Sequence, residues 1–356
     1  MMTTCLSQGR PYSLPFEAGE EFWFDPEEFG DLFPARIVRH MINHAPPPER
    51  EAGGTLLRRL PAAEHLPVVV AARMSLSFPL LIAAVPLYAF NDASPGEAVE
   101  PERCWFSDGG ITSNFPIHFF DAPVPRWPTF AIDLIALAPG RKLSDEECDN
   151  VWMPNENDDG IAEAWVGWEG DSRFGQLGAF SASIFRTAQN WIDNRQMRGA
   201  GYRDRIAHVR MAKDEGGMNL NMKPLEIKRL SERGACAAKR LSERFGPAPP
   251  AGTTLTWDNQ RWIRFRTYMA LLEQQGGQAR HGFQDSSYGG TPMPELNARR
   301  PGVPPDYSWD TGTQRELAIA ATGALLAEFD AWESNGPSFA DGVPQPPLQP
   351  WSIPRV

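Results

Sequence analysis

The feature that most constrains the fold is residues 104–116, where an apolar, strand-like run ends in Asp-Gly-Gly. The run Cys104-Trp105-Phe106-Ser107 leads directly into Asp108, Gly109 and Gly110. Glycine adopts backbone conformations that other residues avoid and lets other atoms approach closely, so the chain can turn sharply here. The pattern predicts a carboxylate at the exit of a strand, on the kind of loop where α/β enzymes place their chemistry. Taken alone, an Asp-Gly pair is typical of an ordinary turn.

The segments on either side give this turn a specific context. Upstream, residues 71–79 combine small residues and serines and end in proline, and the apolar run 80–88 follows. Downstream, Asn114 and Pro116 come shortly after the glycines. This order resembles the C-terminal half of the patatin-like phospholipase domain. That family has a helix with small residues and serines followed by proline, then a strand, then Asp-Gly-Gly or Asp-Gly-Ala, then Asn-x-Pro. The resemblance covers residues 1–140.

The resemblance implies a lipid acyl hydrolase that works with a Ser-Asp dyad and needs neither a cofactor nor a metal. In such an enzyme the serine attacks an ester carbonyl, and the aspartate accepts the serine proton as general base. By resemblance, Asp108 is the catalytic base, Gly109 and Gly110 form the active-site loop, and Asn114 and Pro116 support that loop. An aspartate in water has a pKa of about 3.9, and an apolar site would raise the pKa and make it a better base.

The other half of this machinery is missing from the sequence. Acyl transfer of this kind needs a serine on a Gly-x-Ser-x-Gly elbow, and the family builds its oxyanion hole from a Gly-x-Gly-x-x-Gly loop. Neither pattern occurs in the chain. Both precede Asp-Gly-Gly in the family, so we expect the C-terminal part of a longer patatin-like protein. The nucleophilic serine would then lie outside this chain, on a missing N-terminal half supplied in cis or in trans.

The serines inside the chain are weaker candidates for the nucleophile. Ser75 and Ser77 match family serines that pack the helix beneath the site. Ser107 and Ser113 lie beside the motif, where hydrogen bonding within a turn is the commoner role. Two other readings remain open: a non-catalytic patatin-like binding or scaffold protein, and a truncated gene product. An open parallel sheet without its N-terminal strands would expose an unpaired edge, which predicts poor solubility or marginal folding of the isolated chain.

Metal-binding patterns are weak. His40 and His44 have the i, i+4 spacing that can hold zinc, but the sequence offers no neighbouring Glu and no third ligand, which favours a solvated helix face. His118 follows Asp108, yet its apolar neighbours favour a core or helix-start histidine over a catalytic triad. The acidic runs near Asp145 and Asp158 lack the spacing of a calcium loop. We therefore predict no metal site.

The net charge and the cysteine content limit the partners that the protein can bind and the compartment in which it can reside. The net charge of −11 argues against nucleic acid as a partner, so the predicted partner is an acyl lipid or phospholipid. The four cysteines are scattered without a CxxC pair, which predicts neither a zinc site nor a disulfide and fits a reducing compartment. No secretory signal is visible at the N-terminus. We expect a cytoplasmic protein, with peripheral membrane contact as an alternative that the lipid substrate implies.

The stretch 66–90 is long and apolar, but Arg73 and several prolines interrupt it. This favours a buried helix followed by a buried strand over a membrane span. Residues 130–137 give the clearest strand, nearly continuously apolar, as expected for a strand covered on both faces. A helix start is predicted at residues 25–28, where Asp25 and Pro26 form the start signal, and helices are predicted at 35–44, 68–77, 180–198, 223–245, 256–275 and 315–332.

The predicted fold class is α/β, a partial patatin-like three-layer α/β/α sheet with a mainly helical C-terminal extension. The predicted domains are residues 1–140, the C-terminal part of a patatin-like α/β domain; 141–336, an acidic, Trp-rich insertion with a helical extension; and 337–356, a proline-rich tail. Within this insertion, residues 143–175 are predicted to form a lid-like loop that carries Trp152, Trp165 and Trp168. Packing of the lid onto the core is favoured over insertion of these rings into a lipid interface.

Overall fold

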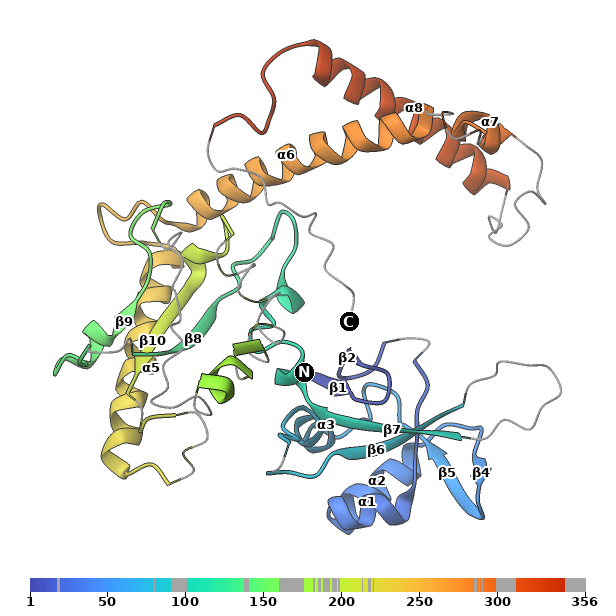
Figure 1. The fold of residues 1–356 in the computed structure, drawn as a ribbon, viewed down its shortest axis with the longest axis vertical. Helices are drawn as coiled ribbons and strands as arrows, with labels where there is room; N and C mark the ends of the chain where they lie inside the picture. Colours follow the sequence, from blue (N-terminus) through green and yellow to red (C-terminus); the bar gives the residue numbers. More distant parts are fainter. Residues whose placement is uncertain are drawn as a thin grey trace. The chain divides into compact units, whose positions relative to one another are not determined.

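The structure is a computed structural model (Figure 1). It describes residues 1–17, 20–79, 81–90, 101–137, 141–159, 176–181, 183, 184, 187, 193, 197, 199–212, 214–216, 219, 221–284, 287, 289, 291–298 and 312–342. These fall into two compact units, the first with the described residues of Met1–Pro116 and Ala164–Arg195, the second with those of Ile117–Glu163 and Gln196–Ile353. The domain boundary predicted near residue 140 stays a prediction.

The first unit is built on a seven-stranded sheet with the order β2-β1-β7-β6-β3-β5-β4. Its strands are β1 (Met2–Cys5), β2 (Arg10–Ser13), β3 (Trp23–Phe24), β4 (Arg50–Ala52), β5 (Thr55–Arg59), β6 (Val85–Phe90) and β7 (Pro101–Asp108). All the described pairings in this sheet are antiparallel, so the parallel sheet expected from the sequence is not what these strands form. The patatin-like three-layer arrangement itself stays a prediction.

Three helices belong to this unit: α1 (Pro26–Leu32), α2 (Ala35–His44) and α3 (Val68–Ser75). Asp25 caps α1 as predicted, since its Oδ1 accepts a hydrogen bond from the Glu27 amide at 2.8 Å. The inner residues of α3 join a core with buried side chains from the sheet and from α1 and α2, among them Phe24, Phe29, Met41, Leu87 and Phe106. Burial of this apolar surface is what holds the helices on the sheet.

The second unit contains a three-stranded sheet with the order β8-β10-β9. Its strands are β8 (Ala131–Ala136), β9 (Val151–Trp152) and β10 (Ile206–Met211), and the helix α5 (Pro224–Phe245) packs on β10 and β9. The prediction that 130–137 is covered on both faces is wrong. Ile132 and Leu134 lie on the same face of β8 and keep 47% and 57% of their surface exposed, so that face is not covered.

The same unit contains the helices α6 (Trp257–Gln284), α7 (Met293–Ala298) and α8 (Gly312–Ser334), and α6 contacts both of the others. α6 is longer than predicted, and α7 was not among the predicted helices. The described residues among 180–198 are helical as predicted. The chain is thus mixed α/β with a helical C-terminal region, as expected. None of the helices in the described ranges has the length and apolar character needed to cross a bilayer.

One covalent feature was not expected from the sequence. Cys148 lies in the 3-10 turn η3 (Glu147–Asn150), and a disulfide joins it to Cys236 of α5. The Cα atoms of the pair are 5.4 Å apart although 88 residues separate them in sequence. Cys5 and Cys104 are free and buried. The prediction of no disulfide fails because spacing in sequence says nothing about which distant segments fold together.

Candidate functional site

Asp108 lies at the end of β7, where the sequence places it. Its backbone amide donates to the Ser77 carbonyl at 3.1 Å, which ties the strand end to the residues that follow α3. Its side chain is half-buried and caps the short 3-10 turn η1 (Gly109–Ile111), because Oδ1 accepts a hydrogen bond from the Gly110 amide at 3.1 Å. The carboxylate is therefore held by its own loop and remains partly accessible to solvent.

Both glycines of the motif lie in close contact with neighbouring atoms. A Cβ at Gly109 would lie 2.5 Å from the backbone oxygen of Met2, and one at Gly110 would lie 2.6 Å from Oδ1 of Asn114. Neither glycine has a positive φ, so backbone conformation does not require glycine here. Space excludes a side chain at Gly109, where the contact is with backbone, whereas at Gly110 the end of the exposed Asn114 side chain can move aside. The sequence motif thus marks a place where the loop packs directly on β1.

Gly109→Ala should destabilise the first unit by about 1–3 kcal/mol, because the Met2 backbone cannot move aside as a flexible side chain would. Gly30→Ala is the matched control. A Cβ at Gly30 meets nothing within 4 Å on α1, and alanine there should stabilise the helix by about 0.5–1 kcal/mol. Urea unfolding of both variants measures the difference. Equal stabilities would show that the contact with Met2 is not tight.

The end of α3 lies against this loop, so the two motifs that the resemblance joined come together in space. The Ser77 carbonyl accepts from the Asp108 amide and, at 2.8 Å, from the Ser107 hydroxyl. Ser77 Oγ in turn donates to the Arg73 carbonyl at 2.7 Å and accepts from the Arg73 guanidinium at 2.6 Å. Burial lowers the pKa of Arg73. These contacts fix the position of the strand exit relative to the helix.

The buried serines near Asp108 are all engaged in structural hydrogen bonds. Ser77 donates to Arg73, Ser107 donates to Ser77, and Ser113 donates to Asp193 at 2.6 Å. All three residues are buried. A hydroxyl that is held this way is not presented to a substrate, which agrees with the view that the nucleophile is not one of these serines. Ser75, at the end of α3, is half-buried.

The loop after Gly110 is held by Asp193, a residue that sequence reasoning did not select. Its carboxylate accepts three hydrogen bonds: from the Ser113 hydroxyl at 2.6 Å, the Asn114 amide at 2.7 Å and the Phe115 amide at 3.0 Å. Asp193 is 1% exposed and comes from a helical residue some eighty positions along the chain. Only the prediction of a helix at 180–198 pointed to this region, and nothing in its pattern marked Asp193.

The remaining predicted site residues lie next to this anchor. Asn114 is exposed, and its Oδ1 is the atom that a side chain at Gly110 would meet. Pro116 is half-buried after Phe115. The structure therefore brings Asp108, Gly109, Gly110 and Asn114 into one turn at the end of β7. Chemically, this turn offers one partly accessible carboxylate next to a rigid backbone, which suits a proton acceptor.

The histidine predictions have mixed outcomes. The rings of His40 and His44 stack with centroids 4.2 Å apart, and His65 stacks on His44 at 4.5 Å. The third imidazole that the sequence did not reveal is therefore present, but hydrogen bonds to the carbonyls of His65 and His40 already engage His40 Nε2 and His44 Nδ1. Among the described residues, no group of three or more His, Cys, Asp or Glu side chains is arranged to hold a metal ion. The side chain of His118 and the residues Trp165 and Trp168 lie outside the described part.

The second unit contains a buried ionic cluster around Asp121. Its carboxylate pairs with Arg205 at 3.2 Å and with Arg264 at 2.8 Å, and it accepts a short hydrogen bond from the Tyr202 hydroxyl. The side chains of all three charged residues are at most 1% exposed. Burial lowers the pKa of Arg205 and raises the pKa of Tyr202 to about 12. Two buried cations thus pair with the same carboxylate.

Asp204 is a buried carboxylate in the same unit, and neither of its oxygens has a hydrogen-bond partner among the described residues. Burial raises its pKa, an effect that the charge on Arg205 only partly offsets. A raised folded-state pKa means that the folded protein binds more protons than the unfolded chain above about pH 3.9. Stability therefore falls as the pH rises from there through the folded pKa.

Asp204→Asn should accordingly stabilise the protein at pH 7, by about 1–3 kcal/mol, because the amide carries no charge to desolvate. The gain should shrink as the pH falls and disappear below about pH 4, where both side chains are neutral in both states. Asp258→Asn, on the exposed start of α6, is the control and should change little. A gain that does not depend on pH would refute the raised pKa. Urea unfolding from pH 4 to 8 makes the measurement.

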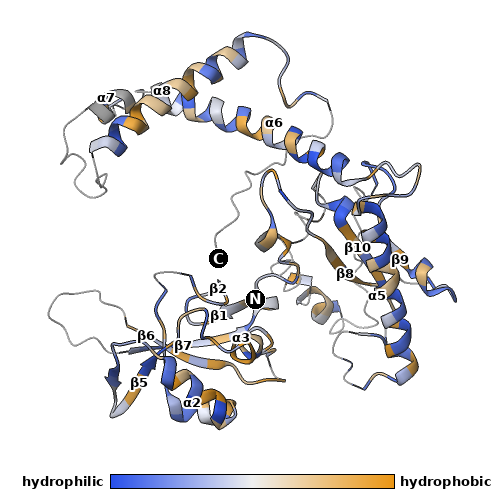
Figure 2. Cartoon of the chain, turned by 180° about the vertical axis from the view of Figure 1, so that it is seen from behind, coloured by the Kyte–Doolittle hydropathy of each residue, from blue (hydrophilic) through white to orange (hydrophobic). Residues whose placement is uncertain are grey.

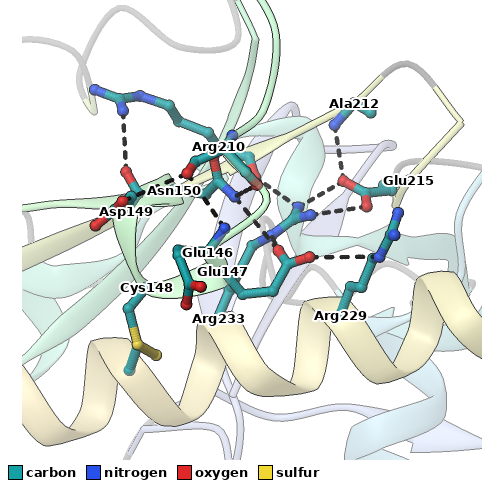
Figure 3. A network of polar contacts seen from close by, with 12 residues as sticks. Glu146, Glu147, Cys148, Asp149, Asn150, Arg210, Ala212, Glu215, Arg229 and Arg233 are labelled. Carbon is teal, nitrogen blue, oxygen red and sulfur yellow. Dashed lines mark hydrogen bonds and ion pairs between the residues drawn. A yellow bond between two sulfur atoms is a disulfide. The ribbon is translucent and has the colours of Figure 1, made fainter.

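A second polar network in this unit links η3, the residues after β10 and α5 (Figure 3). Arg233 is 1% exposed and donates to both oxygens of Glu215, at 2.6 and 3.0 Å, and to Glu147 at 2.5 Å. Burial alone would lower the pKa of Arg233, but these bonds outweigh it and raise the pKa. The Cys148–Cys236 disulfide joins the same two elements, η3 and α5. Because its charges are all paired, we read this network as structural.

Comparisons with known proteins give a narrow result. No family model matches the chain, and no solved structure matches it. A protein from Rhizobium meliloti (strain 1021), described as an RpoH suppressor, is 34% identical over 386 aligned residues. The alignment covers 97% of this chain but 58% of that protein, so the chain spans little more than half the length of this relative. The name of that relative states no chemical activity.

Proposed function

We propose that this chain carries the acid–base half of a patatin-like lipid acyl hydrolase, with Asp108 as the general base and a serine nucleophile outside the chain. The observation that carries the proposal is the position of Asp108. It lies at the end of β7, bonded through its amide to Ser77, and the turn that follows it is anchored by Asp193. The helix-strand-turn order of the resemblance is thus assembled around one carboxylate.

In the proposed reaction the serine oxygen attacks the ester carbonyl of an acyl lipid and passes its proton to Asp108. Protonated Asp108 then gives this proton to the departing alcohol oxygen as the ester C–O bond breaks, which leaves the acyl-serine. In the second half the carboxylate takes a proton from the attacking water and returns it to the serine oxygen as the fatty acid is released. The bond from Gly110 keeps Oδ1 oriented, while the half-buried side chain leaves room for the second oxygen to accept. No cofactor is required, and the substrate class is a phospholipid or another carboxylic ester of a fatty acid.

The test begins with the DNA that precedes the Met1 codon. A reading frame that carries Gly-x-Ser-x-Gly should lie there. The complete product should then label at that serine with a fluorophosphonate and hydrolyse a fluorogenic fatty-acid ester. Asp108→Asn should remove at least 99% of the hydrolysis, in line with the roughly 10²–10⁴-fold worth of a general base, without loss of fold. Labelling of a serine within residues 1–356 would overturn the assignment of the nucleophile.

A second candidate is a non-catalytic patatin-like binding or scaffold protein. The specific observation in its favour is that the hydroxyls of Ser77, Ser107 and Ser113 are buried and bonded to the protein itself. The two candidates differ in one result. If the complete product binds lipid but neither labels with the fluorophosphonate nor hydrolyses an ester, the scaffold reading replaces the hydrolase.

The proposed location is the cytoplasm, with peripheral membrane contact during turnover. This location requires that the Cys148–Cys236 disulfide of the structure be reduced to two thiols in the cell, because disulfides persist mainly in oxidising compartments. We therefore expect four thiols per chain when cells are lysed into a thiol-trapping reagent under denaturing conditions. Two trapped thiols would place the protein in an oxidising compartment instead.

A further inference from the structure

The Cys148–Cys236 disulfide is one of several contacts that join residues 147–151 to α5 (Figure 3). Hydrophilic residues recur along the length of this helix (Figure 2). Four α5 residues contact the segment 147–151, and they have the i, i+4, i+7 and i+11 spacing of one helix face: Arg229, Arg233, Cys236 and Arg240. We call the contacts of the three arginines with this segment the α5 clamp. Since Cys236 is the third of the four, the clamp lies on both sides of the covalent bond.

The α5 clamp does not depend on the disulfide. Glu147, next to Cys148, pairs with Arg233 at 2.5 Å. Arg240 donates to the carbonyls of Cys148 and Val151, at 3.0 and 2.6 Å. These contacts hold the backbone of Cys148 on the helix whether or not the two sulfur atoms are bonded. The Cα atoms of the two cysteines are 5.4 Å apart, and a disulfide needs roughly 4.4–6.8 Å, so the reduced thiols stay within bonding reach.

The two pairs of cysteines in the chain differ in their access to solvent. Cys148 is an exposed residue and Cys236 is half-buried, whereas Cys5 and Cys104 are 0% and 2% exposed. Thiol–disulfide exchange requires that a thiolate reach a sulfur atom, and exposed disulfides are the labile and regulatory ones. The bond at Cys148 can therefore exchange with small thiols while the chain remains folded.

We propose that Cys148 and Cys236 form a reversible redox switch. The switch is open, as two thiols, in a reducing cytoplasm, and it closes when the cell accumulates an oxidant of the low-molecular-weight disulfide class, such as oxidised glutathione. It rests on the proposed cytoplasmic location and not on the proposed hydrolase activity. The α5 clamp makes the switch reversible, because closure then needs no rearrangement of the chain and opening leaves the segment in place.

Closure proceeds by two exchange steps. The Cys148 thiolate attacks one sulfur of the small disulfide, which forms a mixed disulfide and releases one small thiolate. The Cys236 thiolate then attacks the Cys148 sulfur, which forms the Cys148–Cys236 bond and releases the second small thiolate. Two electrons pass from the cysteine pair to the small disulfide, and the two protons of the cysteine thiols go to the two released thiolates.

Closure changes the stability of the chain and not its fold. The two cysteines are 88 positions apart in sequence, and a cross-link that closes so long a loop restricts the unfolded chain. The folded chain keeps the α5 clamp in both states. We therefore expect the closed form to have the same circular dichroism spectrum as the open form and a urea midpoint that is higher by about 1–2 M.

The experiment equilibrates the purified full chain in buffers with rising ratios of oxidised to reduced glutathione. Acid quenching, maleimide labelling and peptide mapping then count the thiols. The chain should pass from four free thiols to two, with Cys148 and Cys236 lost together and Cys5 and Cys104 retained. Dithiothreitol should restore all four without urea. The double variant Cys148→Ser/Cys236→Ser should unfold like the open form and should not respond to glutathione.

Arg240→Met tests the α5 clamp. It removes the hydrogen bonds to the carbonyls of Cys148 and Val151, so the two thiols should meet less often. The ratio of oxidised to reduced glutathione that half-closes the switch should rise at least threefold. Lys239→Met is the matched control on the same helix, because the Lys239 side chain is 73% exposed and pairs with Glu243 outside the clamp. It should close like the unchanged chain, and circular dichroism checks that both variants are folded.

Four results on the purified chain would overturn the inference. If dithiothreitol opens the bond only in urea, or if opening melts the second unit, the disulfide is a permanent structural bond. If oxidation stops at a stable glutathione adduct on Cys148, or joins two chains, the two thiols do not meet in the folded chain. If Arg240→Met closes like Lys239→Met, the α5 clamp does not bring the thiols together.

Thiol trapping in cells tests the location separately. Four thiols per chain are expected before a brief treatment with diamide, which converts cellular glutathione into its disulfide, and two after it. Two thiols in untreated cells reject the cytoplasmic location and a switch that rests open. Four thiols after the treatment reject closure in the cell. Neither result bears on ester hydrolysis, which the fluorophosphonate experiment tests.

Discussion

Asp193→Ala is expected to destabilise the first unit by about 3–5 kcal/mol, a large fraction of the stability of a typical domain. The substitution leaves the Ser113 hydroxyl and the amides of Asn114 and Phe115 buried or partly buried without their acceptor. Each hydrogen bond to a charged group contributes about 1.5–3 kcal/mol, and an unsatisfied buried donor costs a similar amount. Urea unfolding gives the free energy. Hydrogen exchange of the peptide that contains residues 104–116 shows whether the loss is local.

Two variants separate the anchor from the carboxylate that it positions. Asp193→Asn keeps one acceptor oxygen and should lose less, about 1–2 kcal/mol. Asp108→Asn changes a half-buried side chain that can still accept from the Gly110 amide through Oδ1, so its effect on stability should stay below about 1 kcal/mol. If Asp193→Ala unfolds no more easily than Asp108→Asn, the loop does not depend on Asp193.

The contrast between Asp108 and Asp193 shows which parts of this site the sequence could reveal. Asp108 is predictable because its role is local: an apolar run, an aspartate and two glycines are adjacent, and each limits the backbone of the next. Asp193 is not predictable, because its meaning comes from partners about eighty residues away. The same is true of the pair Cys148 and Cys236, whose separation in sequence carries no sign of their contact.

The fold shows the same division. Helix starts such as Asp25-Pro26 are encoded locally and were predicted at the correct residue. The direction in which strands pair was not, because the period of an apolar run identifies a strand but not its neighbour. Residues 131–136 illustrate this. Their continuous apolar character suggested a central strand, yet β8 lies at the edge of the small sheet and pairs only with β10 among the described strands.

Asp121→Asn should have the largest effect in the second unit, a loss of about 3–5 kcal/mol. The guanidinium groups of Arg205 and Arg264 are at most 1% exposed, and both are paired with this carboxylate. Charges interact most strongly where water does not reach. Removing the charge of Asp121 takes away its attraction for both guanidinium groups and leaves these two cations close together. The Arg264 bonds to the Ala122 and Pro123 carbonyls remain, but carbonyl dipoles do not replace a countercharge.

An exposed pair of an aspartate and an arginine shows whether burial sets the strength of the Asp121 pairs. Asp330 pairs with Arg280 at 2.7 Å, a shorter contact than that between Asp121 and Arg205, but the Asp330 side chain is 53% exposed. Asp330→Asn should therefore cost under about 1 kcal/mol. A double variant, Asp121→Asn with Arg264→Met, should recover part of the loss by removing one of the two buried cations that paired with Asp121. If the two single variants are equally stable, burial does not set the strength of these pairs. If the double variant recovers nothing, the loss comes from packing and not from charge.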